Sequence, residues 1–235
     1  MNNQDILIIA AERGLGLGLA EQFFQRGWRL FVTAFPGADT TSLERIAVAD
    51  PARLAIGYID VTAREQIEEL KTALGERKFD VIYLNAGIYG ALHQSVLEAT
   101  DEEMMQIMLT NTFGPARLAR SLLSFLRERG TLAFMSSHRA SIAGNVEGGL
   151  ELYRASKAAL NMLARGIYAD QKARGVTVLS LHPGWAATAM GTLDGRVAAE
   201  IDVLTSVTGV ADVVEHYRHS GQHLYLDYQG KPLPW

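Results

Sequence analysis

The sequence contains no cysteine. Disulfide bonds, thiolate metal sites and cysteine nucleophiles are therefore excluded, and the absence is compatible with a reducing compartment. Basic residues do not outnumber acidic ones, since 22 Lys and Arg stand against 26 Asp and Glu, for a formal net charge of -4. This balance argues against a nucleic-acid-binding surface, which needs clustered basic side chains.

The sequence also lacks any apolar stretch long enough to span a bilayer. Hydrophobic residues make up 48% of the chain and charged residues 20%, which is an ordinary composition for a soluble globular protein. A length of 235 residues is enough for one sizeable α/β domain or for two small ones. We therefore expect a cytoplasmic protein without a membrane partner.

Short, nearly continuous apolar runs alternate with helical patterns along the whole sequence. Strands of a parallel sheet covered on both faces have this character, because both faces of each strand are buried. No linker or repeat interrupts the alternation. We therefore predict a single α/β domain over residues 1–235, a doubly wound Rossmann domain with a mostly parallel seven-stranded sheet and helices on both faces. The predicted strands are 5–10, 28–35, 53–61, 79–87, 131–137, 176–184 and 223–227, and the predicted helices are 19–27, 63–74, 100–130, 152–174 and 207–219.

Small or polar residues follow several of the predicted strands. In a doubly wound sheet, ligands bind beyond the carboxyl ends of the strands. The glycine-rich segment at 12–18 allows the backbone to approach a pyrophosphate, and the helix N-terminus after it favours negative charge. A glycine-rich turn alone is equally compatible with a purely structural role. Together with the other strand ends it predicts a nucleotide site; these ends are Asp60, Asn85–Gly87, Ser136–Ser137 and Pro183–Gly184.

Tyr153 and Lys157 are four residues apart at the start of the predicted helix 152–174. Such residues lie on one face, one turn apart. The ordinary pKa of tyrosine, about 10, is too high for efficient proton transfer near neutrality, and a neighbouring ammonium group should lower it. The pair therefore predicts a general acid or base, with a solvated surface pair as the alternative.

Asn111 lies in the middle of the predicted helix 100–130, and Pro115 follows four residues later. Because proline has no N–H, the carbonyl of Asn111 loses its helical partner, and we expect the helix to kink there. The freed carbonyl could hold a water molecule. The alternative is a kink without a functional role.

A set of segments along the chain forms a recognisable combination: AERGLGLGLA, DVT at 60–62, NAG at 85–87, Asn111, Ser137, YRASK at 153–157, HPGWAAT at 182–188, SSHRASIAGN and the tail YQGKPLPW. With these segments the sequence resembles, over essentially its whole length, the short-chain dehydrogenase/reductase family, and within it the small C-factor-like carbonyl-reductase branch. The resemblance implies an NAD(P)-dependent oxidoreductase that transfers hydride between nicotinamide and a small carbonyl or alcohol substrate, without a metal. A catalytically silent nucleotide-binding regulatory protein of the same fold is the alternative.

The resemblance implies a role for each matching residue. Ser137 would hold and polarise the substrate oxygen, and Tyr153 would exchange the proton. Lys157 would also bond the nicotinamide ribose, and the carbonyl of Asn111 would hold a water that starts a proton relay. The implied catalytic residues are Asn111, Ser137, Tyr153 and Lys157. The implied cofactor-binding residues are Ala10, Arg13, Gly14, Leu15, Gly16, Asp60, Val61, Asn85, Ala86, Gly87, Tyr153, Lys157, Pro183, Gly184 and Thr188.

The choice of nicotinamide depends on the second strand and the glycine turn. An acid at the end of that strand would bond a ribose 2′-hydroxyl and select NAD, but Asp39 comes only later, in the loop. In the family, a basic residue at the position of Arg13 accompanies preference for NADPH, so NADP(H) is favoured and NAD(H) stays open. Ala10 stands where the family has glycine. If that position needs a positive φ, Ala10 costs stability.

Two further expectations concern assembly and substrate. The helical segments 101–129 and 152–174 are apolar around more than one stripe, which predicts a homodimer or homotetramer through these helices. A monomer whose loops cover the surplus apolar face is the alternative. The segments that should cover the substrate, 138–152 and 185–204, carry few charges. They are compatible with a compact, largely uncharged carbonyl compound.

Overall fold

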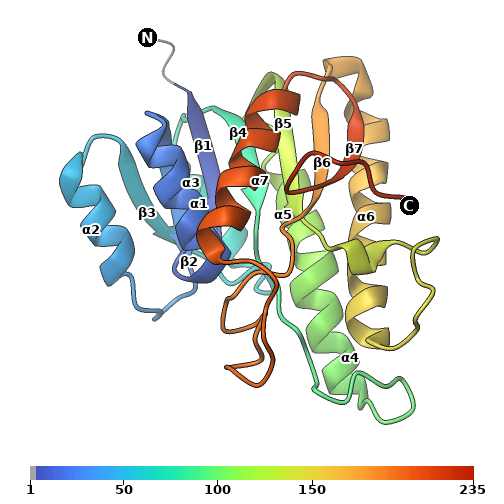
Figure 1. The fold of residues 1–235 in the computed structure, drawn as a ribbon. Coiled ribbons are helices and arrows are strands. Elements are labelled where there is room, and N and C mark those ends of the chain that lie inside the picture. Colours follow the sequence, from blue (N-terminus) through green and yellow to red (C-terminus); the bar gives the residue numbers. More distant parts are fainter. Residues whose placement is uncertain (1–3) are drawn as a thin grey trace.

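The structure is a computed structural model that describes residues 4–235. Seven strands form one sheet in the order β3-β2-β1-β4-β5-β6-β7, and all neighbouring strands are parallel (Figure 1). This confirms the predicted sheet and places its switch point between β1 and β4. The strands are β1 (Asp5–Ile9), β2 (Arg29–Ala34), β3 (Leu54–Tyr58), β4 (Phe79–Leu84), β5 (Leu126–Met135), β6 (Thr177–His182) and β7 (His223–Asp227).

Helices cover both faces of the sheet, as predicted. One core contains side chains of α1, α2 and α7, and the other contains side chains of α3, α5 and α6. None of the helices in residues 4–235 is long and apolar enough to cross a membrane. The helices are α1 (Gly14–Gln25), α2 (Thr41–Ala49), α3 (Gln66–Leu74), α4 (Asp101–Met108), α5 (Gly114–Ser121), α6 (Glu151–Gln171) and α7 (Val203–Tyr217).

Strand β1 explains why the apolar runs are continuous. Ile6 and Ile8 belong to the core under α1 and α7, whereas Leu7 and Ile9 belong to the core under α3, α5 and α6. All four side chains are fully buried. Each contributes about 2 kcal/mol of hydrophobic stabilisation, so a polar residue on either face of this strand would be costly.

The predicted helix 100–130 is wrong in its second half. It consists of α4, a π-helical segment (Leu109–Phe113) and α5, and β5 already begins at Leu126. Leu126 pairs with Phe79 in the sheet, and the backbone N–H of Phe79 donates to the carbonyl of Phe125. Pairing with β4 therefore overrides the helical pattern at this point. The surface residues 127–129 of β5 are charged, which hides the strand in the sequence.

Three other helices differ from expectation. Helix α1 begins at Gly14 rather than at residue 19, so it includes most of the glycine-rich segment 12–18. Helix α2 was not predicted, because Leu43 is the one residue of the helix that is fully buried and the apolar pattern is weak. Helix α7 begins at Val203, earlier than predicted, and the side chain of Asp202 accepts a hydrogen bond from the N–H of Thr205 (2.6 Å). This cap satisfies one of the free N–H groups at the helix start.

Candidate functional site

The turn from β1 into α1 is held tightly by its neighbours. Ala10 has φ +64° and Gly14 has φ +55°. The N–H of Ala10 donates to Thr33 Oγ1 (3.1 Å), and Asn85 Nδ2 donates to the carbonyl of Ala10 (2.7 Å). A Cβ on Gly16 would collide with that same carbonyl oxygen. The strain expected at Ala10 is therefore present, and the surrounding hydrogen bonds maintain it.

The start of α1 has the chemistry of a phosphate site. Its N-cap residue, Arg13, makes no side-chain capping bond, and no acidic residue lies in the first turn. Arg13 is exposed, and none of the ion pairs within residues 4–235 includes it. Free N–H groups at a helix N-terminus bind anions.

Two further observations support a fit to a dinucleotide. Glu12 Oε2, in the same turn, is buried without a hydrogen-bond partner, so it can accept a bond from a ligand hydroxyl. Thr188 lies over the turn, with its Cγ2 3.6 Å from the position of a Cβ on Gly14. The residues present therefore fit a dinucleotide cofactor. The side chain of Leu15 packs against the core, so only its backbone would be available to such a ligand.

Asn111 lies within the π-helical segment between α4 and α5. Its Oδ1 accepts a hydrogen bond from the N–H of Ile88 (2.8 Å), and its Nδ2 donates to the carbonyl of Ile88 (2.9 Å) and to Ser156 Oγ (3.0 Å). The helix thus leaves α geometry next to Pro115, where a kink was expected. The Asn111 side chain therefore joins the loop after β4 to α6, a contact that the sequence does not predict.

Lys157 is almost fully buried beside Asn111. Lys157 Nζ donates to the carbonyl of Met135 (2.9 Å) at the end of β5. A Cβ on Gly87 would lie 3.1 Å from Lys157 Nζ and 3.5 Å from Asn111 Oδ1. The predicted residues Gly87, Asn111 and Lys157 are therefore brought together. Burial lowers the pKa of Lys157 to about 8.

The Tyr153 ring lies close to Lys157, with Nζ 5.8 Å from the ring centroid. Burial raises the pKa of Tyr153 to about 12, while its hydrogen bond with Ser137 acts in the opposite direction. The expected lowering by Lys157 is wrong for this structure. Desolvation disfavours the phenolate form of Tyr153. It also disfavours the charged form of Lys157, which was expected to stabilise that phenolate.

Ser137 follows β5 and is held from two sides. Its Oγ accepts a hydrogen bond from the N–H of Arg139 (3.2 Å), and the hydroxyl of Tyr225 donates to its carbonyl. Beside it, His138 Nδ1 and His182 Nε2 are 3.0 Å apart. Burial lowers the pKa of both histidines, that of His182 to about 3, so both are neutral at pH 7.

The remaining predicted residues lie on the loops at the same edge of the sheet. Asp60 Oδ1 accepts hydrogen bonds from the N–H and Oγ1 of Thr62, each 2.8 Å. Next to Asp60, Val61 is held against the start of α5, because a Cβ on Gly114 would lie against the Val61 carbonyl. The set also includes Ala86, which is buried, Pro183, whose carbonyl accepts a bond from Ser206 Oγ (2.6 Å), and Gly184, at φ +77°.

Sequence reasoning missed several residues of the site. The rings of Tyr89 and Tyr153 are stacked, with centroids 6.0 Å apart and an interplanar angle of 24°. Gln94 is buried in a loop of mostly exposed residues and bonds to the start of α6. No local pattern marks them. The polar residue Tyr225 in the apolar run of β7 is the one signal that could have been noticed.

Known proteins resemble this chain over most of its length. The family model described as enoyl-(acyl carrier protein) reductase matches residues 9–214. C-signal from Myxococcus xanthus is 36% identical over 160 residues, covering 66% of this chain and 92% of that protein. A putative short-chain dehydrogenase/reductase from Burkholderia multivorans with bound NADP has a TM-score of 0.92 and 36% identity, covering 99% and 100% of the two chains. A carbonyl reductase from Pseudomonas aeruginosa PAO1 in complex with NADP has a TM-score of 0.90 and 37% identity, covering 100% of both.

The parallel sheet, its glycine turn at the switch point and the Tyr153–Lys157 pair define a Rossmann-fold oxidoreductase. The chain belongs to the short-chain dehydrogenase/reductase family of NAD(P)-dependent oxidoreductases. This confirms the resemblance read from the sequence, and C-signal among the relatives confirms the C-factor-like branch.

Proposed function

We propose that the protein is an NADP(H)-dependent reductase of small carbonyl compounds, with Asn111, Ser137, Tyr153 and Lys157 as its catalytic residues. The observation that carries the proposal is the meeting of Gly87, Asn111 and Lys157 beside the Tyr153 phenol. A binding protein without turnover has no need of a phenol proton donor beside a buried ammonium group. The alternative of a silent regulatory protein rested on the altered glycine motif, and no other observation favours it.

Three of the four proposed catalytic residues have a task that follows from their positions. The nicotinamide supplies the hydride, and Gly87 and Lys157 would lie along its ribose. Ser137 would hold the substrate oxygen by a hydrogen bond, and Tyr153 would transfer its proton to that oxygen. With a pKa of about 12, Tyr153 carries its proton at pH 7. In the direction of reduction the phenol would therefore act as an acid.

Three features of the chain support preference for NADP(H). Arg13 is exposed and without an ion-pair partner among the described residues, so it is available to a 2′-phosphate. Strand β2 ends at Ala34, and the next residue, Phe35, is exposed and uncharged. Asp39 accepts a hydrogen bond from the N–H of Thr41 (2.9 Å) and so serves the start of α2. The two solved relatives with bound NADP support the same choice.

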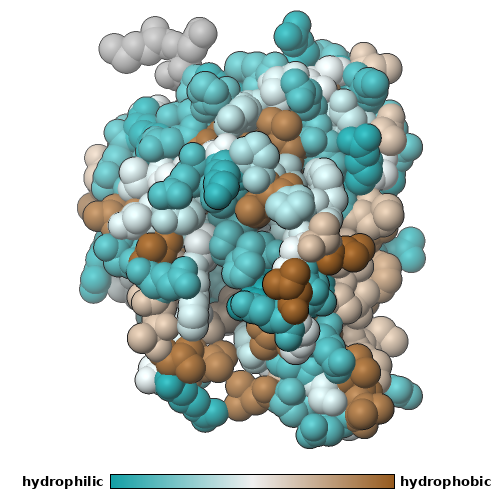
Figure 2. Space-filling model, turned by 45° about the vertical axis from the view of Figure 1, so that its right-hand side comes forward, coloured by the Kyte–Doolittle hydropathy of each residue, from teal (hydrophilic) through white to brown (hydrophobic). Residues whose placement is uncertain are grey.

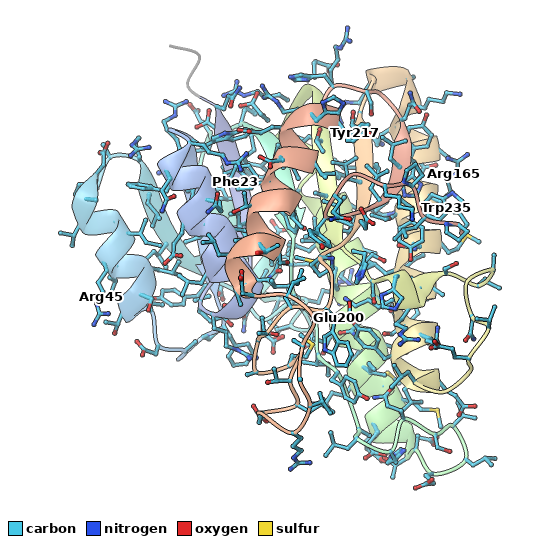
Figure 3. All side chains as sticks on the ribbon, in the orientation of Figure 1. Phe23, Arg45, Arg165, Glu200, Tyr217 and Trp235 are labelled. Atoms are coloured by element: carbon cyan, nitrogen blue, oxygen red, sulfur yellow. The ribbon has the colours of Figure 1, made fainter. Side chains whose placement is uncertain are left out.

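The rim of the site is formed by the loop after β4 and by the segments 138–152 and 185–204. Its side chains support an uncharged substrate with apolar substituents. Apolar side chains gather at the lower end of the molecule in Figure 2, where the loops after the strands lie. Arg139, in the same rim, is neutralised by Glu147 at 2.6 Å. Figure 3 shows Glu200 beneath the carboxyl ends of the strands, where its carboxylate would disfavour an anionic substrate. The large exposed apolar residues of these loops are Leu92, Val96, Leu97, Ile142, Val146, Trp185, Met190 and Val197.

The outer face of the helices supports a homodimer or homotetramer. Met105, Phe113 and Met162 are exposed by 59%, 46% and 70%, respectively, on α4, the π-helical segment and α6. Contact with the same helices of a second subunit would cover them. A cytoplasmic location remains a prediction from the sequence.

Oxidation of NADPH with a panel of aldehydes and ketones tests the proposed activity. The variant Tyr153→Phe loses only the hydroxyl, so turnover should fall by two or more orders of magnitude (roughly 10²–10⁴-fold for a general acid). Folding and NADPH binding should be retained. A Tyr153→Phe enzyme with near-wild-type kcat would refute the mechanism, and a wild-type protein that binds NADPH but reduces no carbonyl in the panel would favour the silent alternative.

A further inference from the structure

Gln94 is buried in a part of the chain that is otherwise exposed. Its side chain is only 4% accessible, whereas Leu92, Val96 and Leu97 are each at least half exposed. A buried amide group is costly unless it is hydrogen-bonded. Gln94 also has φ +58°, a conformation that non-glycine residues adopt rarely. The inward position of this side chain therefore costs free energy twice, through the buried amide group and through the left-handed backbone conformation.

The amide group of Gln94 is fully used. Its Nε2 donates to the carbonyls of Tyr89 (2.8 Å) and Ala91 (2.7 Å), and its Oε1 accepts a bond from the N–H of Tyr153 (2.9 Å). The backbone carbonyl of Gln94 accepts a further bond from the N–H of Glu151 (3.1 Å). Two carbonyls need a donor and one N–H needs an acceptor, so only one orientation of the amide satisfies all three.

These bonds replace the cap that α6 lacks. The residue before the helix, Leu150, lies in the left-handed region at φ +50° and makes no side-chain capping bond. Free N–H groups at a helix start need a partner. Gln94 supplies it to Glu151 and Tyr153, which are the first and third residues of α6. A residue of a distant loop therefore fixes the first turn of the helix that carries the proton donor.

The same side chain holds the ring that contacts Tyr153. Gln94 binds the carbonyl of Tyr89, and the ring of Tyr89 stacks on the ring of Tyr153 at 6.0 Å. Tyr153 is thus fixed at its backbone by Gln94 and at its ring by Tyr89. Both constraints pass through one amide group.

We propose that Gln94 is a positioning residue for Tyr153: it caps the first turn of α6 and clamps Tyr89 against the Tyr153 ring, so that the phenol hydroxyl keeps its direction. The inference rests on the proposed function, because positioning matters only where Tyr153 transfers a proton. Small displacements of a reacting group are expensive, with about 1 Å costing on the order of a hundredfold in rate.

Two substitutions at Gln94 and one control separate the contributions. Gln94→Met keeps the length of the side chain and loses all three bonds. Gln94→Glu keeps the acceptor for the Tyr153 N–H and loses both donors. Gln171→Met, at the other end of α6, removes an amide that bonds Arg174 Nη1 (3.0 Å) and is the matched control. The readouts are kcat and KM for the best carbonyl substrate, the Kd of NADPH from fluorescence, the pH profile of kcat, and hydrogen exchange of the peptide 151–156.

Gln94→Met should lower kcat roughly ten- to a hundredfold and leave the Kd of NADPH unchanged. The decline of the rate near pH 8 should stay in place, because Lys157 sets it and keeps its contacts. Gln94→Glu should fall between Gln94→Met and wild type, and Gln171→Met should match wild type. Tyr89→Leu should lower kcat as well. Adding it to Gln94→Met should cost little more, because the two changes remove one clamp.

A folded Gln94→Met enzyme with wild-type kcat would overturn the proposal, as would an equal loss in Gln171→Met or a loss that appears only in the Kd of NADPH. If Gln94→Met fails to fold, Gln94→Glu decides, since a kcat equal to wild type there would refute the clamp on Tyr89. If the wild-type protein reduces no carbonyl, the proposed function fails separately. Hydrogen exchange then decides the structural part: faster exchange of 151–156 in Gln94→Met supports the cap, and unchanged exchange refutes it.

Discussion

Ala10 allows a direct test of the strain in the glycine turn. It adopts φ +64°, which costs a non-glycine residue about 1–2 kcal/mol. Ala10→Gly removes this cost but gives the unfolded chain more freedom, which offsets about 0.4–1 kcal/mol. The hydrogen bonds from Asn85 and to Thr33 involve the backbone of Ala10 and are kept. The expected result is therefore a net stabilisation of about 0.5–1 kcal/mol, or a rise in Tm of about 2 °C for a chain of this size.

The neighbouring alanine is the matched control for this substitution. Ala11 is fully buried and is not among the residues with positive φ. Ala11→Gly should therefore lose the methyl burial and gain only flexibility, for a destabilisation of about 1.5 kcal/mol. Thermal unfolding followed by circular dichroism measures both variants. If Ala10→Gly lowers Tm as Ala11→Gly does, the turn does not store the strain that its φ implies.

Three further predictions concern the cofactor, the pH dependence and the assembly. Arg13→Ala should weaken NADPH binding and leave NADH binding unchanged in a fluorescence titration; a wild-type preference for NADH would contradict the role of Arg13. Carbonyl reduction should decline as the pH rises through about 8, because Lys157 loses its charge there while Tyr153, with a pKa of about 12, keeps its proton; a flat rate up to pH 10 would contradict this. Met162→Glu should reduce the mass in sedimentation equilibrium to the 25.7 kDa of one chain, whereas a wild-type protein already at that mass would refute the homo-oligomer.

The sequence predicts the sheet well because a parallel strand buried on both faces leaves no room for polar residues. That constraint produces readable runs such as 5–10 and 223–227. It fails at Leu126, where β5 starts with charged surface residues and is fixed by pairing to Phe79. It fails again at α2, where Leu43 is the one fully buried residue and the apolar pattern is weak. Local patterns therefore predict elements with a long buried face, and they miss elements that bury little or that a distant partner specifies.

Gly18 shows the same limit at the level of one residue. The glycine motif explains Gly14 and Gly16 from the turn, but it gives no reason for a glycine inside α1. In the structure, a Cβ at position 18 would lie 3.0 Å from Val207 Cγ1 on α7. The close approach of α1 and α7 therefore favours a glycine here. A contact between residues so far apart in the chain cannot be derived from either segment alone.

The site separates what spacing determines from what burial determines. Spacing correctly places Tyr153 and Lys157 on one helical face, since Nζ lies 5.8 Å from the ring centroid. A charged lysine one helical turn away would favour the phenolate. The pKa of Tyr153 is nevertheless raised, with desolvation as the largest cause, and desolvation also lowers the pKa of Lys157. Contacts such as the Tyr89 ring and the Gln94 amide create that burial. The protonation state of the donor is thus decided by residues that carry no catalytic signature in the sequence.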